Sequence, residues 1–139
     1  RELALDVLVA AEMATEDDLS VRAMQLREGA GVDRLADHQW ALAGGNIDRG
    51  RNIFLDHPVA QCLRCHSLRG NGGVAGPALD GIGARQSRDQ ILSSLVDPSA
   101  ALVEGFETDT GISAMPEIHW TLTADEIRDL LEFVCSEAD

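Results

Sequence analysis

Aromatic residues and long apolar runs are scarce in this 139-residue chain, which has no tyrosine and only 4% aromatic residues. No apolar stretch approaches the roughly 20 residues of a membrane-spanning helix, so the chain is not expected to cross a bilayer. Basic residues are few, 11 against 24 acidic ones, and the net charge of −13 argues against nucleic acid and anionic membranes as partners. Strand patterns are almost absent, which favours an all-α fold.

Cysteine is scarce too, but two of the three cysteines belong to the most specific motif in the chain. The stretch CLRCH places Cys62, Cys65 and His66 in the C-x-x-C-H spacing through which haem c is attached. Cysteines three positions apart share one helical turn, where each sulfur can form a thioether with a haem vinyl group. His66 then directs its imidazole at the iron as an axial ligand. We expect one haem c, covalently bound through Cys62 and Cys65.

A bare C-x-x-C pair also occurs in zinc sites, redox dithiols and disulfides. Structural zinc usually takes four Cys or His ligands in two clusters, whereas Cys135 stands alone in the sequence. A thioredoxin-type dithiol is expected beside a strand-helix-strand pattern, which is missing. Once the motif cysteines hold haem, Cys135 has no intrachain partner. We interpret it as a buried helical thiol rather than an intermolecular disulfide, because it falls beside Leu131.

Methionine is the usual second axial ligand in a carrier of raised potential, and the chain has three. Met13 and Met24 lie on helical patterns well before the motif, where an apolar packing role is expected. Met115 lies in an irregular loop, in which Pro116 fixes the backbone and prevents helix formation. We therefore predict Met115 as the distal iron ligand. In the alternatives, Met115 only covers the haem edge, or His119 is the ligand.

Helical periodicity covers most of the chain outside these loops. Capping boxes are predicted where Ser87 precedes Gln90 and where Thr123 precedes Glu126. His38 lies within the third helical stretch and is expected to face solvent rather than to compete for the iron. The expected helices span residues 2–14, 15–29, 33–43, 47–55, 87–96, 98–103 and 123–134.

Glycine in the middle of a helix marks the expected contact between two of these helices. Gly50 costs about 1 kcal/mol of helix propensity relative to alanine, which indicates that another helix crosses closely there. The expected partner is the last helix, with Phe54 meeting Phe133 or Val134.

Four features, taken in order along the chain, are similar to those of class I cytochrome c domains: the motif at 62–66, the segment GPAL at 76–79, Met115 with its proline, and the last amphipathic helix. Within that family the chain most resembles the C-terminal cytochrome c domains of large secreted bacterial proteins that also carry helical repeats and a sugar-dehydrogenase-like β-propeller. The resemblance implies a class I cytochrome c fold for residues 45–139. It further implies that residues 1–44 are a helical extension or the tail of an upstream helical domain.

The resemblance also implies a role for Pro77, whose carbonyl would accept the Nδ1 hydrogen of the proximal His66. The segment before Met115 is shorter than in those relatives, with only residues 107–110 between Phe106 and Gly111. Further side chains are candidates around the haem. Ile82, Leu92, Leu95 and Phe106 are expected to line it, and Arg85 or Trp120 to bind a propionate.

These features together predict an electron-transfer protein rather than an enzyme. Its partners would be a redox protein, favoured to be basic, or a fused dehydrogenase domain, with the oligomeric state left open. Haem c attachment implies a periplasmic or otherwise exported protein, although no secretory signal is visible. The alternative function is a gas-binding or sensing module with an open distal site, which the short 107–110 connection motivates. A haem oxidase or peroxidase is less favoured, because no His and Arg pair is evident to assist O–O cleavage.

Overall fold

The computed structural model describes residues 34–139, which form the second of two compact units; the chain divides after Asp33. The described unit begins at Arg34, earlier than residue 45, where the resemblance sets the start of the cytochrome c fold. The helices expected at 2–14 and 15–29, with Met13 and Met24, lie outside the described residues.

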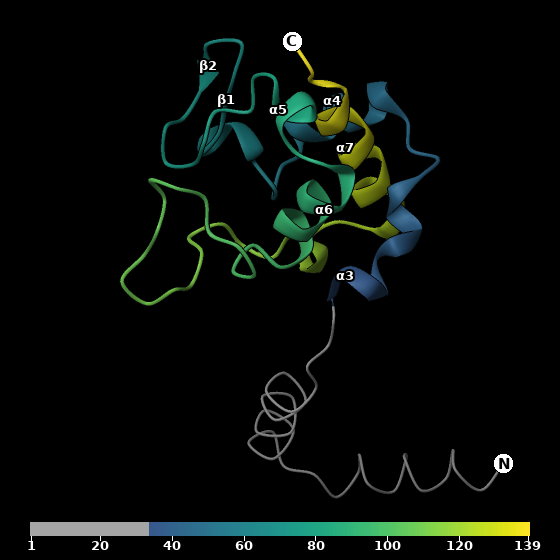
Figure 1. Ribbon diagram of the computed structural model, residues 1–139. Coiled ribbons are helices and arrows are strands. Elements are labelled where there is room, and N and C mark those ends of the chain that lie inside the picture. Colours follow the sequence, from purple (N-terminus) through teal and green to yellow (C-terminus); the bar gives the residue numbers. More distant parts are fainter. Residues whose placement is uncertain (1–33) are drawn as a thin grey trace, which may run out of the picture. The chain divides into compact units, whose positions relative to one another are not determined.

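The described unit is mostly helical, with one minimal hairpin (Figure 1). The elements, with η for a 3-10 helix, are α3 (Arg34–Asp37), η1 (Gln39–Leu42), α4 (Ile47–Asp56), η2 (Cys62–Arg64), β1 (Ser67–Leu68), β2 (Asn71–Gly72), α5 (Ile82–Arg85), α6 (Arg88–Val96), η3 (Ile118–Trp120) and α7 (Ala124–Ser136). Strands β1 and β2 pair antiparallel, with Ser67 opposite Gly72. Within residues 34–139, none of these helices has the length and apolarity needed to cross a bilayer.

Both predicted capping boxes are present at the starts of α6 and α7. The Ser87 hydroxyl accepts the N–H of Gln90, whose side chain accepts the Ser87 N–H in return. Thr123 and Glu126 make the same reciprocal pair at α7. Each box satisfies two backbone N–H groups that the first helical turn leaves unpaired.

Helices α4 and α7 cross at Gly50, as predicted from the sequence. A Cβ atom at Gly50 would lie 1.9 Å from the carbonyl oxygen of Asp129 and 2.7 Å from the Cβ of Phe133. One turn further along α4, the rings of Phe54 and Phe133 are 5.6 Å apart between centroids. Only glycine allows the two backbones to approach this closely.

A buried carboxylate locks the same two helices together. Asp129 of α7 accepts the backbone N–H of Asn46 at 2.7 Å, and the Arg49 guanidinium donates to both of its oxygens. Because a buried carboxylate is costly without partners, these bonds fix the start of α4 against α7.

The core is apolar and draws on α4, α6 and α7, with contributions from the segments on either side of them. Ala41 of η1 and Ile118 of η3 are buried in it, so residues 34–44 pack on this core. Cys135 is half-buried against the same cluster. The largest fully buried side chains are Phe54, Leu92, Leu130, Leu131 and Val96.

The expected continuous helix over 33–43 is wrong, because the chain breaks at His38. The backbone there has φ −112° and ψ 11°, and the His38 Nδ1 atom bonds the Arg34 carbonyl oxygen at 2.7 Å. A short α-helix therefore precedes His38 and a 3-10 helix follows it.

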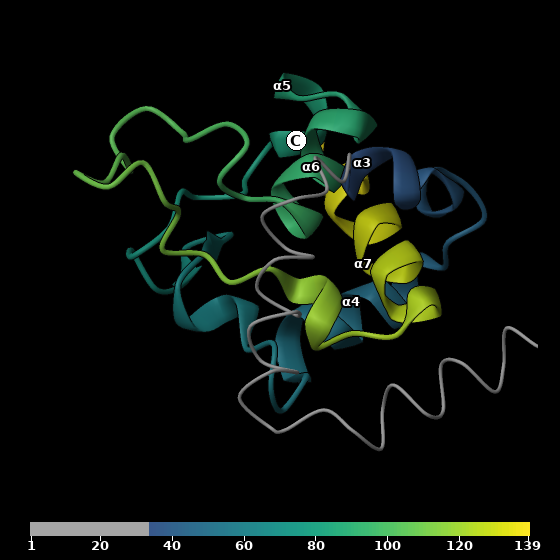
Figure 2. The same cartoon turned by 90° about the horizontal axis from the view of Figure 1, so that it is seen from below.

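The expected helix over 98–103 is also wrong. The segment holds only a turn, in which the Ala100 N–H bonds the Asp97 carbonyl oxygen at 3.0 Å. From the end of α6 to η3 the chain is irregular, and this long segment lies to one side of the helices (Figures 1 and 2). Too few backbone bonds form after Pro98 to propagate a helix.

Candidate functional site

Cys62, Cys65 and His66 lie on one tight turn, as their spacing predicts. The N–H groups of Cys65 and His66 both bond the carbonyl oxygen of Cys62, at 3.2 and 3.0 Å. Gln61, with a left-handed φ of 44°, turns the chain into η2. This turn brings the two thiols and the imidazole onto one short stretch of backbone.

The loop that leads into the turn is held by His57. Its Nδ1 atom accepts the N–H groups of Val59 and Ala60, at 3.3 and 3.0 Å. The other ring nitrogen lies 3.8 Å from Glu126 in the α7 capping box. His57 therefore serves as a structural cap and bridges α4 to α7.

The Nδ1 atom of His66 lies 2.8 Å from the carbonyl oxygen of Pro77. A carbonyl can only accept a hydrogen bond, so Nδ1 carries the proton in this pair. The neutral ring then has its lone pair on Nε2, which is the nitrogen free to bind a metal. This tautomer suits an axial iron ligand.

Glycines of the 70–77 loop wrap tightly around the turn, and their role was not recognised from the sequence. A Cβ atom at Gly76 would lie 2.8 to 3.2 Å from three atoms of the His66 ring. At Gly73 it would lie 2.1 Å from the Arg64 carbonyl oxygen. The N–H groups of Gly73 and Gly76 bond the carbonyls of Leu63 and Cys65, both at 2.8 Å. The glycine run was the available signal, since close backbone approach is a usual reason for glycine.

The state of the thiols argues against a reactive dithiol. Burial raises the pKa of the Cys62 thiol to about 11, and both Cys62 and Cys65 are unpaired. A redox-active C-x-x-C pair needs a lowered thiol pKa, because the thiolate is the nucleophile. Within residues 34–139, no three His, Cys, Asp or Glu side chains are grouped so that they could hold a metal ion. The raised pKa of Cys62 therefore argues against a reactive dithiol.

Met115 is half-buried and packs against the core. Its N–H bonds the Ser113 hydroxyl at 3.1 Å, and the Ser113 N–H bonds the Ser99 hydroxyl at 3.0 Å. The segment that carries Met115 lies on the same side of α4 and α7 as the segment of the haem motif (Figures 1 and 2).

Glu117, two residues after Met115, is the centre of an ionic contact that sequence reasoning missed. Its carboxylate accepts Arg34 Nη1 at 2.8 Å through one oxygen and the Trp120 indole N–H at 3.0 Å through the other. Arg34 also lies 3.6 Å from Asp97 at the end of α6. Trp120, expected as a possible propionate donor, here donates to Glu117. No local sequence pattern indicates a pair 83 residues apart.

His119 and His38 lie together in a cluster of rings. The His119 ring is 5.4 Å from that of His38 and 4.6 Å from that of Trp120. Burial lowers the pKa of His119, an effect that the Glu117 carboxylate opposes. His38 is half-buried rather than solvent-facing as expected, because its ring contacts those of Trp40 and His119.

The other side chains expected around the haem divide into two groups. Leu92 and Leu95 are buried in the core, and Ile82 is half-buried against it. Phe106, in contrast, is 38% exposed. The guanidinium of Arg85 donates to the backbone carbonyls of Asp80 and Ala78, which tethers the loop after Pro77.

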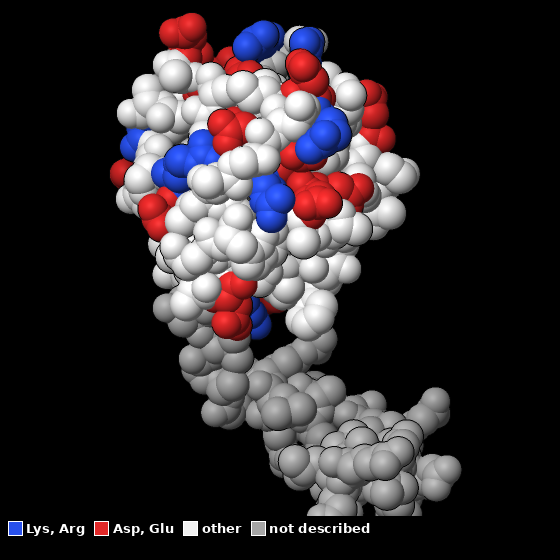
Figure 3. Space-filling view, turned by 90° about the vertical axis from the view of Figure 1, so that its right-hand side faces the viewer, with Lys and Arg blue, Asp and Glu red and all other residues white. Residues whose placement is uncertain are grey.

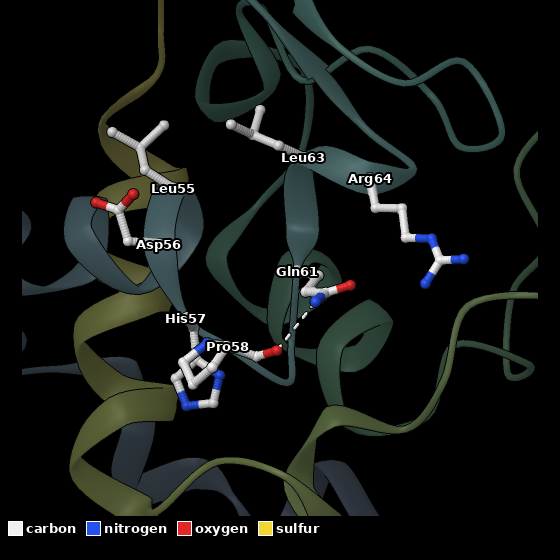
Figure 4. A pocket seen from close by; sticks show the side chains of 7 residues that line it. All are labelled: Leu55, Asp56, His57, Pro58, Gln61, Leu63 and Arg64. Atoms are coloured by element: carbon white, nitrogen blue, oxygen red, sulfur yellow. Dashed lines mark hydrogen bonds between the residues drawn. The ribbon is translucent and has the colours of Figure 1, made fainter.

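A hollow of about 400 Å³ lies beside the haem motif (Figure 4). It is bordered by the end of α4 and by Leu63 and Arg64, the two residues between the motif cysteines. Gln61 spans it with a 3.0 Å bond to the Pro58 carbonyl. Cys62, Cys65 and His66 are not among the residues that line it. Its lining residues are Leu55, Asp56, His57, Pro58, Gln61, Leu63 and Arg64.

Charge is distributed unevenly over the described unit. On the face seen in Figure 3, acidic and basic side chains are interspersed. Helix α7 pairs its carboxylates with arginines, as in Glu132 with Arg88 at 2.7 Å. Between Arg88 and Arg128, in contrast, the sequence contains no lysine or arginine. The exposed acidic side chains Glu104, Glu107 and Asp109 lie in that interval.

The chain matches one protein family in sequence and a solved structure in fold. Residues 47–137 match the family model described as Cytochrome c. The crystal structure of SoxXA from P. pantotrophus is similar, with a TM-score of 0.52 and 20% identity, over 70% of this chain and 85% of that one. At that identity the similarity shows the fold alone. No curated protein sequence matches the chain.

Proposed function

The chain belongs to the cytochrome c family, and on this basis we propose that it is a mono-haem electron carrier with His66 and Met115 as the axial ligands. The family implies covalently attached haem c, and Cys62 and Cys65 stand in the C-x-x-C-H spacing with His66. The fold is the mostly helical cytochrome c fold. An electron-transfer role needs no catalytic acid, base or nucleophile.

The observation that carries the proposal is the 2.8 Å bond between His66 Nδ1 and the Pro77 carbonyl. It leaves Nε2 as the free donor on the same turn as the two thiols. When bound, the haem supplies one-electron chemistry through ferric and ferrous iron. Pro77 orients the proximal ring and raises its basicity, and Gly76 packs on the same ring.

Met115 is proposed as the distal ligand because it is the one methionine of residues 34–139 and packs against the core. A thioether ligand favours the ferrous state and raises the potential. The hydroxyls of Ser113 and Ser99 restrain the backbone on its N-terminal side.

The proposed partners are redox proteins, and the acidic interval that includes Glu104, Glu107 and Asp109 favours a basic one. A fused dehydrogenase domain, as in the multidomain proteins that the chain resembles, is the second proposed partner. We further propose an exported, periplasmic setting, since cytochrome c domains are typically exported. Residues 45–139 are proposed as the haem domain proper, with residues 34–44 packed on its core.

The absorption spectrum of the oxidised and reduced holoprotein tests this function. We expect low-spin haem c in both states and a sulfur-to-iron charge-transfer band in the ferric protein. Addition of carbon monoxide to the reduced protein distinguishes the carrier from a gas sensor. Resistance to carbon monoxide supports the carrier, whereas rapid binding at the iron would support a sensor with an open distal site.

A further inference from the structure

One short stretch carries two side chains able to ligate haem iron, and only one of them can be the distal ligand at a time. Met115 and His119 are four residues apart, with Glu117 between them. Residue type alone does not decide between them, because sulfur and imidazole both bind haem iron. Their surroundings differ, however.

The carboxylate of Glu117 is held from two directions. Arg34 donates to one oxygen at 2.8 Å, and the Trp120 indole donates to the other at 3.0 Å. Arg34 comes from α3, at the opposite end of the described sequence, and its guanidinium also lies 3.6 Å from Asp97. The Met115 segment is thereby tied to both α3 and the end of α6.

The backbone of Arg34, independently of its side chain, also fixes the surroundings of His119. Its backbone carbonyl bonds His38 Nδ1 at 2.7 Å, and the His38 ring packs 5.4 Å from the His119 ring. The His119 Nε2 atom lies 3.7 Å from Glu117, and the His119 side chain is only 11% exposed. His119 is therefore confined between Glu117 and the rings of His38 and Trp120.

The N-terminal side of Met115 is restrained far less. The contacts that fix the backbone there are neutral ones, made by the hydroxyls of Ser113 and Ser99 and by the Thr108 hydroxyl, which bonds the Ile112 carbonyl at 2.7 Å. The Ile112 side chain is exposed. A charge-assisted bond is stronger than these neutral ones. The Arg34–Glu117 contact therefore anchors the stretch, together with the burial of Ile118 in the core.

We propose that the Arg34 side chain selects the distal ligand: by holding Glu117 it keeps His119 against the rings of His38 and Trp120 and leaves Met115 to supply the sulfur. This rests on the proposed assignment of Met115 as the ligand. Arg34 is a positioning residue, since its side chain acts through Glu117.

The variant Arg34→Gln, prepared as the full-length holoprotein, tests whether Arg34 decides between Met115 and His119 as the distal ligand. A fraction of the ferric protein should lose the sulfur-to-iron band and acquire a bis-histidine spectrum, with a lower midpoint potential. The ratio of histidine-ligated to methionine-ligated protein should rise roughly two- to fivefold, the range expected for a partly exposed ion pair. Arg34→Lys keeps the charge and should remain close to wild type. In the double variant Arg34→Gln/His119→Gln, the bis-histidine spectrum should disappear.

Arg88→Gln is the matched control. It removes an ion pair to Glu132 of 2.7 Å, with side-chain exposures of 35% and 28%, against 26% and 32% for Arg34 and Glu117. It also removes a 2.9 Å bond from Arg88 to the Leu42 carbonyl, as Arg34→Gln also removes the contact with Asp97. This pair joins α6 to α7 and has no contact with the Met115 segment. It should leave the band and the potential unchanged, which separates selection from a general loss of stability.

Three results would overturn the proposal. In one, Arg34→Gln keeps the wild-type band and potential, as Arg88→Gln does. In another, the Arg34→Gln spectrum persists without change in the double variant, so that the new ligand is not His119. In the third, the wild-type ferric protein lacks the sulfur band and Met115→Ala leaves the spectrum unaltered. The third result would refute Met115 as the distal ligand. The first two would refute only the proposal that Arg34 selects it.

Discussion

His66 and Pro77 are joined by a 2.8 Å hydrogen bond that spans eleven positions of the sequence. The glycine-rich loop between them folds back over the motif turn, and Gly76 approaches the imidazole closely. Pro77 and Gly76 thus fix the orientation of the His66 ring through protein contacts alone. Such orientation of a ligating histidine is expected to strengthen its bond to the iron.

Gly76→Ala should weaken the proximal ligand. The added methyl group would lie within 3.2 Å of three ring atoms of His66, so the ring must tilt and its bond to Pro77 must lengthen. In an acid titration followed by absorption spectroscopy, we expect His66 to leave the iron at a higher pH in Gly76→Ala than in wild type. Val74→Ala is the control, because this side chain of the same loop is 88% exposed. Equal acid midpoints in the two variants would refute the packing role.

Met115→Ala should leave haem covalently bound but remove the soft distal ligand. We expect a lower midpoint potential and rapid carbon monoxide binding by the reduced protein, measured by redox titration and by flash photolysis. Ile112→Ala, at a 64% exposed position of the same segment, should match wild type in both measurements. An unchanged potential in Met115→Ala would show that another residue is the ligand.

Cys62→Ser should leave a single thioether through Cys65. We expect part of the haem to be lost when the protein is denatured and separated by electrophoresis, as measured by haem staining of the chain. Cys135→Ser is the matched control, since this half-buried thiol lies on α7, outside the motif, and should not affect retention. Full retention in Cys62→Ser, or loss in Cys135→Ser, would contradict the attachment assignment.

Gly50→Ala should destabilise the holoprotein although alanine is the better helix former. A Cβ at Gly50 would overlap the Asp129 backbone and the Phe133 side chain of α7, and overpacking of this kind costs about 1–3 kcal/mol. Denaturant unfolding monitored by circular dichroism measures the loss. Asn52→Ala, at an exposed position of the same helix, should be neutral or slightly stabilising. A gain of stability in Gly50→Ala would show that the helices do not cross closely there.

The stability of the protein should depend on Asp129 in acid. The hydrogen bond from Arg49 holds the pKa of Asp129 below its usual value of 3.8. A carboxyl with a depressed folded-state pKa contributes its full stability above the unfolded-state pKa and loses it as pH falls through the folded-state pKa. Asp129→Asn should therefore lower the free energy of unfolding by about 1–3 kcal/mol at neutral pH. The difference from wild type should shrink below about pH 4 in denaturant titrations. If the difference in free energy of unfolding between wild type and Asp129→Asn stays constant with pH, ionisation of Asp129 is not linked to folding.

Several parts of the fold could be predicted because they depend on neighbouring residues. The capping boxes at Ser87 and Thr123 join residues three positions apart. The motif turn bonds His66 to Cys62 within a single turn. The close crossing at Gly50 was also predictable, since an unfavourable helical glycine needs a tertiary reason.

Other predictions failed where tertiary contacts replaced helical bonds. The 33–43 stretch has helical periodicity, yet it breaks where His38 bonds the Arg34 carbonyl and packs on His119. The stretch after Pro98 forms a turn instead of the expected helix. Helical periodicity indicates which side chains form an apolar face. It does not indicate which tertiary contacts will replace the helical hydrogen bonds of the backbone.

The sequence by itself determined the chemistry of attachment, because two thiols and an imidazole within five residues can only lie together, whatever the rest of the chain does. The tertiary structure decided how those groups are held. The contact of Gly76 with the His66 ring and the pairing of Arg34 with Glu117 bring together groups that the backbone does not constrain to meet. Such contacts form only when the core of α4, α6 and α7 has packed, since burial of that core offsets the entropy of closing the long loops between them.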